Sequence, residues 1–431
     1  MIVSTGDEAP VEEARVGLGR PLRVALLSGR DDASRRGVAR IALAAAAERC
    51  AVAPTDDPRS FGELAQAFRD AAPDVVLVGP DPKGVAAMAV LLEALRLGCG
   101  TQLPAPRIFV IADPRVADQL RPAAVGFPFE ISSEVGEVVT ALRAFRRGAH
   151  KDLTLRDELI EDAARSLASS TGGDALVVDV SEASTSCVLA RADGLEAAHI
   201  VPLGLGAAGD HVVARAGLDR VRRWLPRAID APALLERVFN RALWPGALPA
   251  TEAALALEMA LAREAIAHAL RDAEYAGLDA AAMRAAPAVL VTGRAASFPR
   301  AAQTLLVAVD GIEPSGVTAV FREPDDGRAE RVALVVSIRP RRYATVLLTH
   351  AGGRVEHRVA RGSFTLVPLS GDVEVSAKGA PVKGIGHGGA IGVLIDARGR
   401  PLLLPKRDAE RIPTVLRWHA TLRALPSQGA A

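Results

Sequence analysis

One stretch, residues 174–190, combines an acid with a row of hydroxyl side chains, and it is the first place in the chain to look for chemistry. It reads as an apolar strand that ends in Asp179, a tight polar turn that begins at Ser181, and a second apolar strand that follows Ser184 and Thr185. Carboxylate and hydroxyl oxygens bind cations and accept hydrogen bonds. We therefore take Asp179, Ser181, Ser184 and Thr185 as candidate binding residues.

Two glycine-bearing segments are further candidates. Residues 201–210 are rich in glycine, and Gly204 and Gly206 could let the backbone approach a phosphate. The spacing of these glycines fits no P-loop, so a plain loop is the alternative. Gly293 follows another predicted strand and precedes Arg294, which could stack on an adenine or lie in a salt bridge or in solvent.

Few other residues suggest catalysis. His387, between glycines, is the single catalytic candidate, and the alternative is a linker residue. His268 is expected on the polar or boundary side of a long helix that Thr251 caps. No Ser-His-Asp set or metal cluster is apparent. The three cysteines show no zinc spacing and are predicted to be buried, reduced thiols.

The composition excludes several classes of protein. The 431 residues carry a net charge of +1 with interspersed signs, which argues against a nucleic-acid or membrane-surface partner. No run of about 18 apolar residues is present, so no membrane span is expected. The first 20 residues are polar and lack the apolar segment of a secretory signal, and we expect a disordered arm and a cytoplasmic protein.

The predicted elements divide the chain into regions. Residues 21–150 alternate short apolar strands with helices, one of them over residues 35–50, which predicts a Rossmann-like α/β domain. This domain lacks GxGxxG, so a ligand site and a structural or docking role both stay open. Residues 329–431 predict a small β-rich C-terminal domain with a final helix. In it we expect a glycine-rich link at 384–392 and a last hairpin over 392–404.

The hairpin at 174–190 resembles the phosphate-binding hairpin of the actin-like ATPase superfamily. There an Asp orders Mg²⁺ and water, and two glycines let backbone N–H groups reach the phosphates. The resemblance implies that residues 151–328 form an actin-like (ribonuclease H-like) lobe, that Asp179 is a metal ligand, and that ATP and Mg²⁺ are possible cofactors. The glycine pair is replaced by Ser181 and Glu182, and a second acid by Ser186, so the site is degenerate.

The chain as a whole resembles the glutamate mutase L family, actin-like ATPase relatives encoded beside cobalamin-dependent mutases. The family's N-terminal lobe and first phosphate loop are absent, and its adenosine turn keeps only Gly293. The resemblance therefore implies a truncated and degenerate member. The resemblance to the family is carried by five stretches, residues 73–79, 106–113, 174–189, 304–317 and 392–402.

Phosphate transfer in this superfamily needs donors on both sides of the cleft, so we do not expect the chain to hydrolyse ATP by itself. The first hypothesis is a non-catalytic scaffold or docking protein without a cofactor, whose partner is a mutase subunit or a paralogue. The second is an ATP-dependent reactivating factor, or chaperone, whose missing lobe comes from a partner chain. Glu182 discriminates them, because the second fails if that side chain points into the cleft. An unrelated enzyme in the Rossmann-like domain is the third, and a homo-oligomer is compatible with each.

Overall fold

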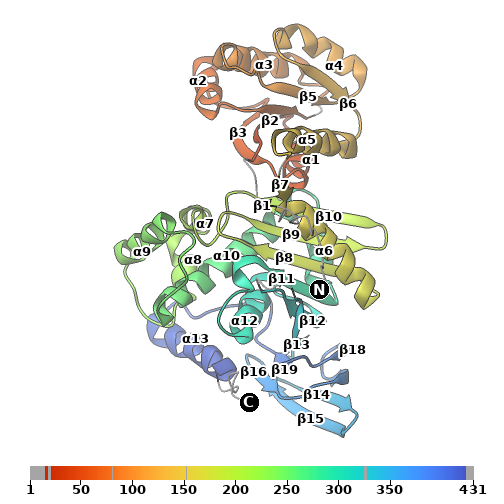
Figure 1. Cartoon of the computed structure of the whole chain (residues 1–431), viewed down its shortest axis with the longest axis vertical. Helices are drawn as coiled ribbons and strands as arrows, with labels where there is room; N and C mark the ends of the chain where they lie inside the picture. The colour runs from red at the N-terminus through yellow and green to blue at the C-terminus, as the bar shows by residue number, and fades with distance from the viewer. Residues whose placement is uncertain (1–14, 18–20, 80, 152, 325–327, 424–431) are drawn as a thin grey trace, which may run out of the picture.

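The computed structural model describes residues 15–17, 21–79, 81–151, 153–324 and 328–423. Three sheets follow one another from the N-terminal region at the top of Figure 1 to the C-terminal region at the bottom. A two-stranded sheet of β1 (Arg15–Gly17) and β7 (Leu153–Leu155) lies near the junction of the first two. No helix in these described ranges is long and apolar enough to cross a membrane.

The N-terminal sheet has five parallel strands in the order β3-β2-β4-β5-β6. One apolar core joins it to α2, α3 and α4, and a second core joins its other face to α1 and α5. Apolar strands covered on both faces are what the sequence predicts for a Rossmann-like domain, and this prediction is confirmed. The strands are β2 (Arg23–Ser28), β3 (Glu48–Pro54), β4 (Val75–Val78), β5 (Arg107–Ile111) and β6 (Phe129–Ser132). The helices are α1 (Asp32–Ala44), α2 (Phe61–Ala71), α3 (Val85–Cys99), α4 (Pro114–Leu120), η1 (Arg121–Ala124) and α5 (Val135–Ala149).

The helix predicted over residues 35–50 is wrong at its C-terminal end. It ends at Ala44, and Ala46 adopts a left-handed conformation with φ +51°. The chain then enters β3, which pairs with β2. The run of alanines at 44–47 has a high helix propensity, and tertiary pairing overrides it here.

The central sheet has eight strands in the order β10-β9-β8-β11-β12-β13-β19-β16. Its first three strands form an antiparallel meander, and β11 and β12 run parallel to β8. This order is the one expected for an actin-like (ribonuclease H-like) lobe, so the predicted fold class is confirmed. The strands are β8 (Ala175–Val180), β9 (Thr185–Arg191), β10 (Gly194–Ile200), β11 (Ala288–Thr292), β12 (Gly316–Arg322), β13 (Glu330–Ser337), β16 (Phe364–Val367) and β19 (Gly392–Asp396).

Helices cover both faces of the central sheet. Helix α6 packs on one face, over β8, β9 and β11, whereas α10 and α12 form the largest apolar core of the molecule on the other. Helix α10 is buried over most of its length, and its charged residues Glu258, Arg263, Glu264 and Asp272 have little exposed surface. The helices of this region are α6 (Arg156–Thr171), α7 (Gly209–Ala216), α8 (Leu218–Arg222), α9 (Ala231–Leu243), α10 (Glu252–Tyr275), α11 (Ala280–Ala285), η2 (Gly293–Ala295), α12 (Ala301–Ile312) and α13 (Asp408–Arg423).

The C-terminal region is β-rich as predicted, but it is not separate from the central sheet. Strands β13, β19 and β16 extend that sheet, and a four-stranded sheet in the order β15-β14-β17-β18 packs against them in one core. The predicted boundary at residues 328 and 329 stays a prediction. The four strands are β14 (Tyr343–His350), β15 (Gly353–Ala360), β17 (Asp372–Lys378) and β18 (Lys383–His387).

Two local predictions for this region are wrong. Residues 384–392 are not a plain link, because β18 occupies most of the first half. The hairpin predicted over 392–404 does not form, since β19 pairs in parallel with β13 and antiparallel with β16 instead. Both errors arise because glycine content and apolar runs do not reveal distant strand partners.

Candidate functional site

The turn between β8 and β9 is closed by its own serines. The Ser181 N–H donates to the Ser184 carbonyl oxygen at 2.9 Å, and the Ser184 N–H donates to Ser181 Oγ at 3.1 Å. The two hydroxyl oxygens lie 3.0 Å apart. The structure therefore brings these two predicted residues together, but in contacts with each other that stabilise the turn.

The glycine-rich loop after β10 lies directly on this turn. The N–H groups of Leu205 and Gly206 donate to the carbonyl oxygens of Ser181 and Glu182, each at 2.9 Å. A Cβ on Gly204 would lie 2.4 Å from the Glu182 oxygen, so only glycine permits this approach. These two N–H groups of the loop therefore point to the hairpin backbone and hold the loop against the turn.

The same loop holds the last of the predicted hydroxyl groups. Thr185 is fully buried, and its Oγ1 donates to the carbonyl oxygen of Leu203 at 2.8 Å. This hydroxyl therefore has a backbone partner within the lobe. The contacts of the loop and the turn thus form one packed unit.

Asp179 is fully buried and bound by an arginine. Arg156, the first residue of α6, donates from Nε to Oδ2 at 3.0 Å and from Nη2 to Oδ1 at 2.5 Å. The Thr292 hydroxyl at the end of β11 donates to Oδ1 at 2.8 Å. Gly293 follows at φ +70°, and a Cβ there would lie 2.7 Å from Asp179 Oδ1, so glycine allows β11 to turn over the ion pair.

A magnesium ion does not fit this arrangement. It requires carboxylate oxygens at about 2 Å with several waters in an octahedron, and both oxygens of Asp179 already face the guanidinium of Arg156. A bidentate arginine supplies the positive charge that a cation would otherwise bring. In the described part of the chain, no group of three His, Cys, Asp or Glu side chains could hold a metal ion.

Arg294 is a salt-bridged side chain, which is one of the two alternatives that the sequence left open. Its Nε and Nη2 each lie 3.0 Å from a carboxylate oxygen of Glu258 on α10, and Nη1 lies 3.4 Å from Glu182. Arg241 also contacts Glu258 at 2.8 Å. Glu182 is 47% exposed and lies on the rim of the turn beside Arg294, so it points neither wholly inward nor wholly outward.

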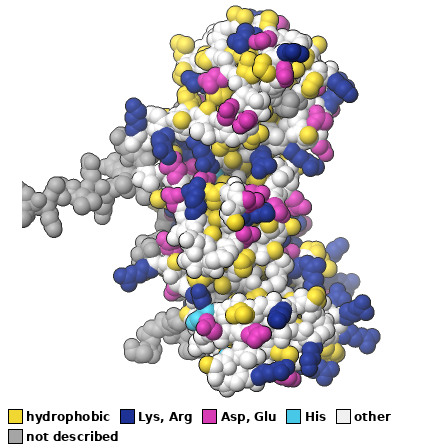
Figure 2. Space-filling view, turned by 90° about the vertical axis from the view of Figure 1, so that its right-hand side faces the viewer, with side chains coloured by type: hydrophobic (Ala, Val, Ile, Leu, Met, Phe, Trp, Pro, Cys, Tyr) yellow, Lys and Arg dark blue, Asp and Glu magenta, His cyan; other side chains and the backbone are white. Residues whose placement is uncertain are grey.

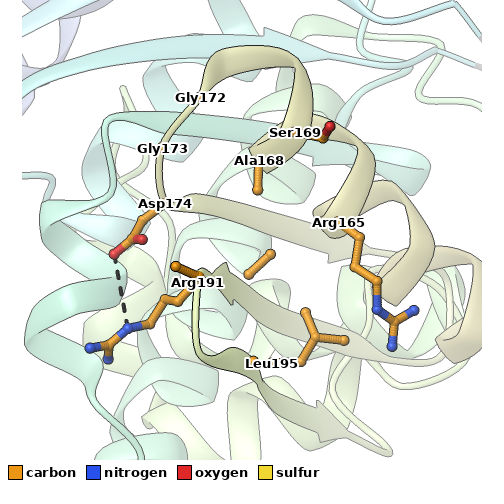
Figure 3. A pocket seen from close by; sticks show the side chains of 11 residues that line it. Arg165, Ala168, Ser169, Gly172, Gly173, Asp174, Arg191 and Leu195 are labelled. Carbon is orange, nitrogen blue, oxygen red and sulfur yellow. Dashed lines mark ion pairs between the residues drawn. The ribbon is translucent and has the colours of Figure 1, made fainter.

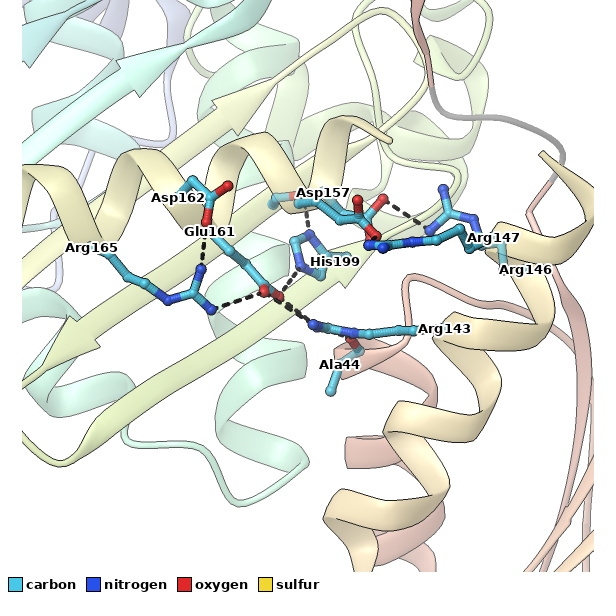
Figure 4. A network of polar contacts seen from close by, with 11 residues as sticks. Ala44, Arg143, Arg146, Arg147, Asp157, Glu161, Asp162, Arg165 and His199 are labelled. Atoms are coloured by element: carbon cyan, nitrogen blue, oxygen red, sulfur yellow. Dashed lines mark hydrogen bonds and ion pairs between the residues drawn. The ribbon is translucent and has the colours of Figure 1, made fainter. Parts of the chain in front are cut away.

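A second polar network lies behind the hairpin, between α5 and α6 (Figure 4). Glu161 accepts hydrogen bonds from Arg143, and His199 of β10 lies 3.4 Å from it and 2.7 Å from the Ser186 hydroxyl. Burial alone would raise the pKa of Glu161, but the hydrogen bonds from His199 and Arg143 lower the pKa to about 2. Arg146 pairs with Asp157 at 2.9 Å in the same junction. The network ties the Rossmann-like region to the central sheet.

A cavity of about 610 Å³ lies at the opposite end of β8, between the end of α6 and the β9–β10 turn (Figure 3). Its most polar side chain, Arg191, lies within 4.0 Å of carboxylate oxygens of Asp174, Asp193 and Asp279. Arg165 is paired with Asp162. The charges of this cavity are therefore balanced, and none of the predicted site residues lines it.

The other predicted residues, the two histidines and the three cysteines, contact the backbone or lie in or near the core. His387 lies in β18, and its Nδ1 accepts the N–H of Gly389 at 3.1 Å. His268 is only 9% exposed, so it lies in the core side of α10 rather than on the predicted boundary. Cys99 and Cys187 are buried as predicted, Cys50 is half-buried, and burial raises the pKa of Cys187 to about 12.

Sequence reasoning missed the arginines that complete these contacts. Arg156 and Arg241 carry no local motif, and their partners lie 23 and 17 positions away. The contact of Thr292 with Asp179 could have been predicted. Thr292 lies at the end of β11 just before Gly293, and the ends of the parallel strands β11 and β8 lie side by side.

Comparisons with known proteins add one remote structural similarity. No protein-family model matches the chain, and no curated protein matches it. Among solved structures it is similar to the type II variant of the Aquifex aeolicus Ppx/GppA phosphatase, with 11% identity over 56% of this chain. The match covers 61% of that chain at a TM-score of 0.18, which is too low to carry an argument. The fold assignment therefore rests on the sheet order, and no comparison supports the glutamate mutase L family.

Proposed function

We propose that this chain is a non-catalytic accessory protein that docks on another protein, and that its actin-like lobe no longer uses a nucleotide. One observation carries the proposal. Arg156 binds both carboxylate oxygens of Asp179, the residue that the superfamily resemblance makes a magnesium ligand. The N–H groups of Ser181, Ser184, Leu205 and Gly206 all donate within the turn and the glycine-rich loop.

An exposed apolar patch next to the hairpin supports docking. It consists of Phe239 and Leu243 on α9 and of Trp244 and Leu248 just after it, which are 54%, 71%, 73% and 76% exposed. Arg294 reaches the carbonyl oxygens of this segment, which connects the patch to the closed site. Large exposed apolar side chains that gather in one place mark interaction surfaces more often than isolated ones do.

The occupant we propose for the patch is a subunit of a cobalamin-dependent mutase, which the family resemblance implies as the partner. Figure 2 shows hydrophobic, acidic and basic side chains mixed over one face, with Lys and Arg gathered at its lower end. An exposed apolar patch on a chain with a net charge of +1 suits a protein partner rather than a nucleic acid.

Calorimetric titration of Mg-ATP into the purified chain tests the nucleotide part of this proposal. We expect no heat of binding for the wild type or for Glu182→Gly, because Arg156 remains bound to Asp179 in both proteins. Micromolar binding by the wild type would overturn the proposal and favour the ATP-dependent reactivating factor. Binding by the glycine variant alone would show that Glu182, and not Arg156, closes the site.

Sedimentation of the chain with the purified cobalamin-dependent mutase of the same organism tests the docking part. We expect a complex that the double variant Trp244→Ser, Leu248→Ser weakens at least about tenfold, since buried aromatic anchors dominate such interfaces. Leu103→Ser is the matched control, because Leu103 is 92% exposed on the Rossmann-like region. Absence of a complex, or equal loss with the control variant, would contradict the proposed partner or the proposed patch.

A further inference from the structure

A second cavity, of about 260 Å³, lies among α8, α10, α11 and the end of α12, and it is lined by an unusual number of arginines. Five guanidinium groups surround it, against three carboxylates. Trp224 forms part of the wall and lies under two of the arginines, with ring distances of 4.6 and 5.1 Å. The arginines are Arg220, Arg223, Arg263, Arg271 and Arg284.

The three carboxylates are already shared. Glu264 accepts from Arg220 and from Arg223, each at 3.0 Å, and also from the Trp224 indole N–H at 2.8 Å. Asp310 divides its oxygens between Arg263 and Arg398, each at 2.8 Å. The third carboxylate, Glu313, accepts the N–H of Leu402 at 2.9 Å. Glu264 and Asp310 therefore each bind two arginines, and Arg284 lies 3.9 Å from Glu274 outside the cavity wall. The residues that line the cavity still carry more positive than negative charge.

Several guanidinium nitrogens in this wall are buried without a partner in the described part of the chain. They are Nε and Nη2 of Arg271, Nη1 of Arg263 and Nε of Arg223. The Arg263 side chain is only 2% exposed. Buried donors in native proteins nearly always have a partner, and one left unpaired is destabilising. These nitrogens are buried, so an anion that enters the cavity would first meet the more exposed guanidinium groups of Arg220, Arg223 and Arg284, whose side chains are 41%, 28% and 32% exposed.

The electrostatics of the neighbouring groups agree with an excess of positive charge. Burial lowers the pKa of Arg271, and Arg220 and Arg223 lower it further, which Glu264 and Asp272 offset only in part. Asp272 is itself shared by Arg49 and Arg215. Burial, followed by the charge of Arg271, lowers the pKa of His268 to about 4.

We propose that this cavity binds the phosphate group of a small phosphorylated molecule. Guanidinium groups bind phosphate oxygens through paired N–H donors, and four arginines from α10 and α8 with its following turn surround one small volume. A cavity of about 260 Å³ is slightly smaller than the usual range for drug-sized ligands, so it suits one or two phosphate groups with a compact body.

This site is separate from the hairpin. Helix α10 serves both regions, with Glu258 at the hairpin and the stretch from Arg263 to Arg271 at the cavity. These positions are 5 to 13 residues from Glu258, which is roughly 8 to 20 Å along a helix. Phosphate binding at the cavity therefore requires neither Asp179 nor magnesium.

Calorimetric titration with inorganic phosphate, pyrophosphate and a three-carbon sugar phosphate tests the proposal. We expect saturable binding by the wild type and a loss of at least about tenfold with Arg271→Gln, because a charge-assisted hydrogen bond is removed. Arg354→Gln, on the exposed strand β15, is the matched control and should bind like the wild type. Tighter binding of inorganic phosphate than of the sugar phosphate would make the free ion the ligand, and the reverse order would favour a phosphorylated metabolite.

Thermal unfolding separates a lost site from a damaged fold. The ligand-free Arg271→Gln variant should unfold at or above the temperature of the wild type, since it removes two buried nitrogens that have no partner in the described residues. Phosphate should no longer raise that temperature. Equal stabilisation of wild type, Arg271→Gln and Arg354→Gln by phosphate would overturn the proposal, as would no binding by the wild type. If Arg271→Gln unfolds at a lower temperature, Arg284→Gln provides the second variant, because Arg284 lines the cavity and its ion pair with Glu274, at 3.9 Å, is partly exposed. Unchanged phosphate binding by that variant would overturn the proposal as well.

Discussion

Helix α10 connects the β8–β9 hairpin to the arginine-lined cavity, and these two regions differ in how their buried charges are paired. At the hairpin every carboxylate has an arginine, as in the pairs Asp179 with Arg156 and Glu258 with Arg294. At the cavity the arginines outnumber the carboxylates, and Arg271 keeps buried nitrogens without a partner in the described residues. A balanced site needs no ligand, whereas an unbalanced one is stabilised when a ligand binds. We therefore propose that the region that resembles a nucleotide site takes no ligand, and that the cavity without a motif takes one.

The largest effect should come from breaking the balance at the hairpin. Arg156→Met leaves the carboxylate of Asp179 buried and unpaired, and the free energy of unfolding should fall by about 3–5 kcal/mol. Urea denaturation measures this change. The double variant Arg156→Met, Asp179→Asn should recover much of the loss, and a single variant within 1 kcal/mol of the wild type, about the value of an exposed pair, would contradict the account.

Low pH should destabilise the folded protein by protonating Glu161. Its pKa is lowered to about 2 in the folded protein, below the value near 4.3 of an unfolded chain. The folded state is therefore stabilised above pH 4.3, by roughly 2–3 kcal/mol, and this stabilisation is lost as the pH falls toward 2. Urea midpoints between pH 6 and pH 3 should fall less steeply for Glu161→Gln than for the wild type. Parallel curves for the two proteins would contradict the assignment.

At the arginine-lined cavity, removing an arginine with unpaired nitrogens should not destabilise the protein. Without ligand, Arg271→Gln should leave the free energy of unfolding unchanged or raise it by about 1 kcal/mol, because an unsatisfied buried donor is removed. Arg220→Gln should destabilise, since it takes a partner from Glu264. Urea denaturation of both variants checks this contrast, and a clear loss for Arg271→Gln would show that its side chain supports the fold.

The smallest effect concerns His268, which reports the charge near the cavity. NMR titration should give a pKa of about 4, and Arg271→Gln should raise that pKa toward the ordinary value near 6.5. Phosphate binding to the wild type should shift the pKa of His268 in the same direction. A pKa that neither change moves would argue that burial alone sets it.

The fold could be predicted further than the site. Alternating apolar strands and helices indicated the Rossmann-like region, and the strand-turn-strand at 174–190 indicated the actin-like lobe. The sequence could not indicate that Arg156 reaches Asp179, because that contact joins the start of α6 to the end of β8. The arginine cavity was equally hidden, since Arg220, Arg271 and Arg284 come from three helices that only the tertiary fold brings together. Contacts between elements depend on packing, which no local pattern records.

The most direct test of the contrast is a calorimetric titration of pyrophosphate, with and without magnesium, into the wild type, Asp179→Asn and Arg271→Gln. The account predicts binding to the wild type that does not require magnesium, that Asp179→Asn retains, and that Arg271→Gln loses. Binding that requires magnesium, or that Asp179→Asn abolishes while Arg271→Gln keeps it, would place the phosphate site at the hairpin and contradict the account.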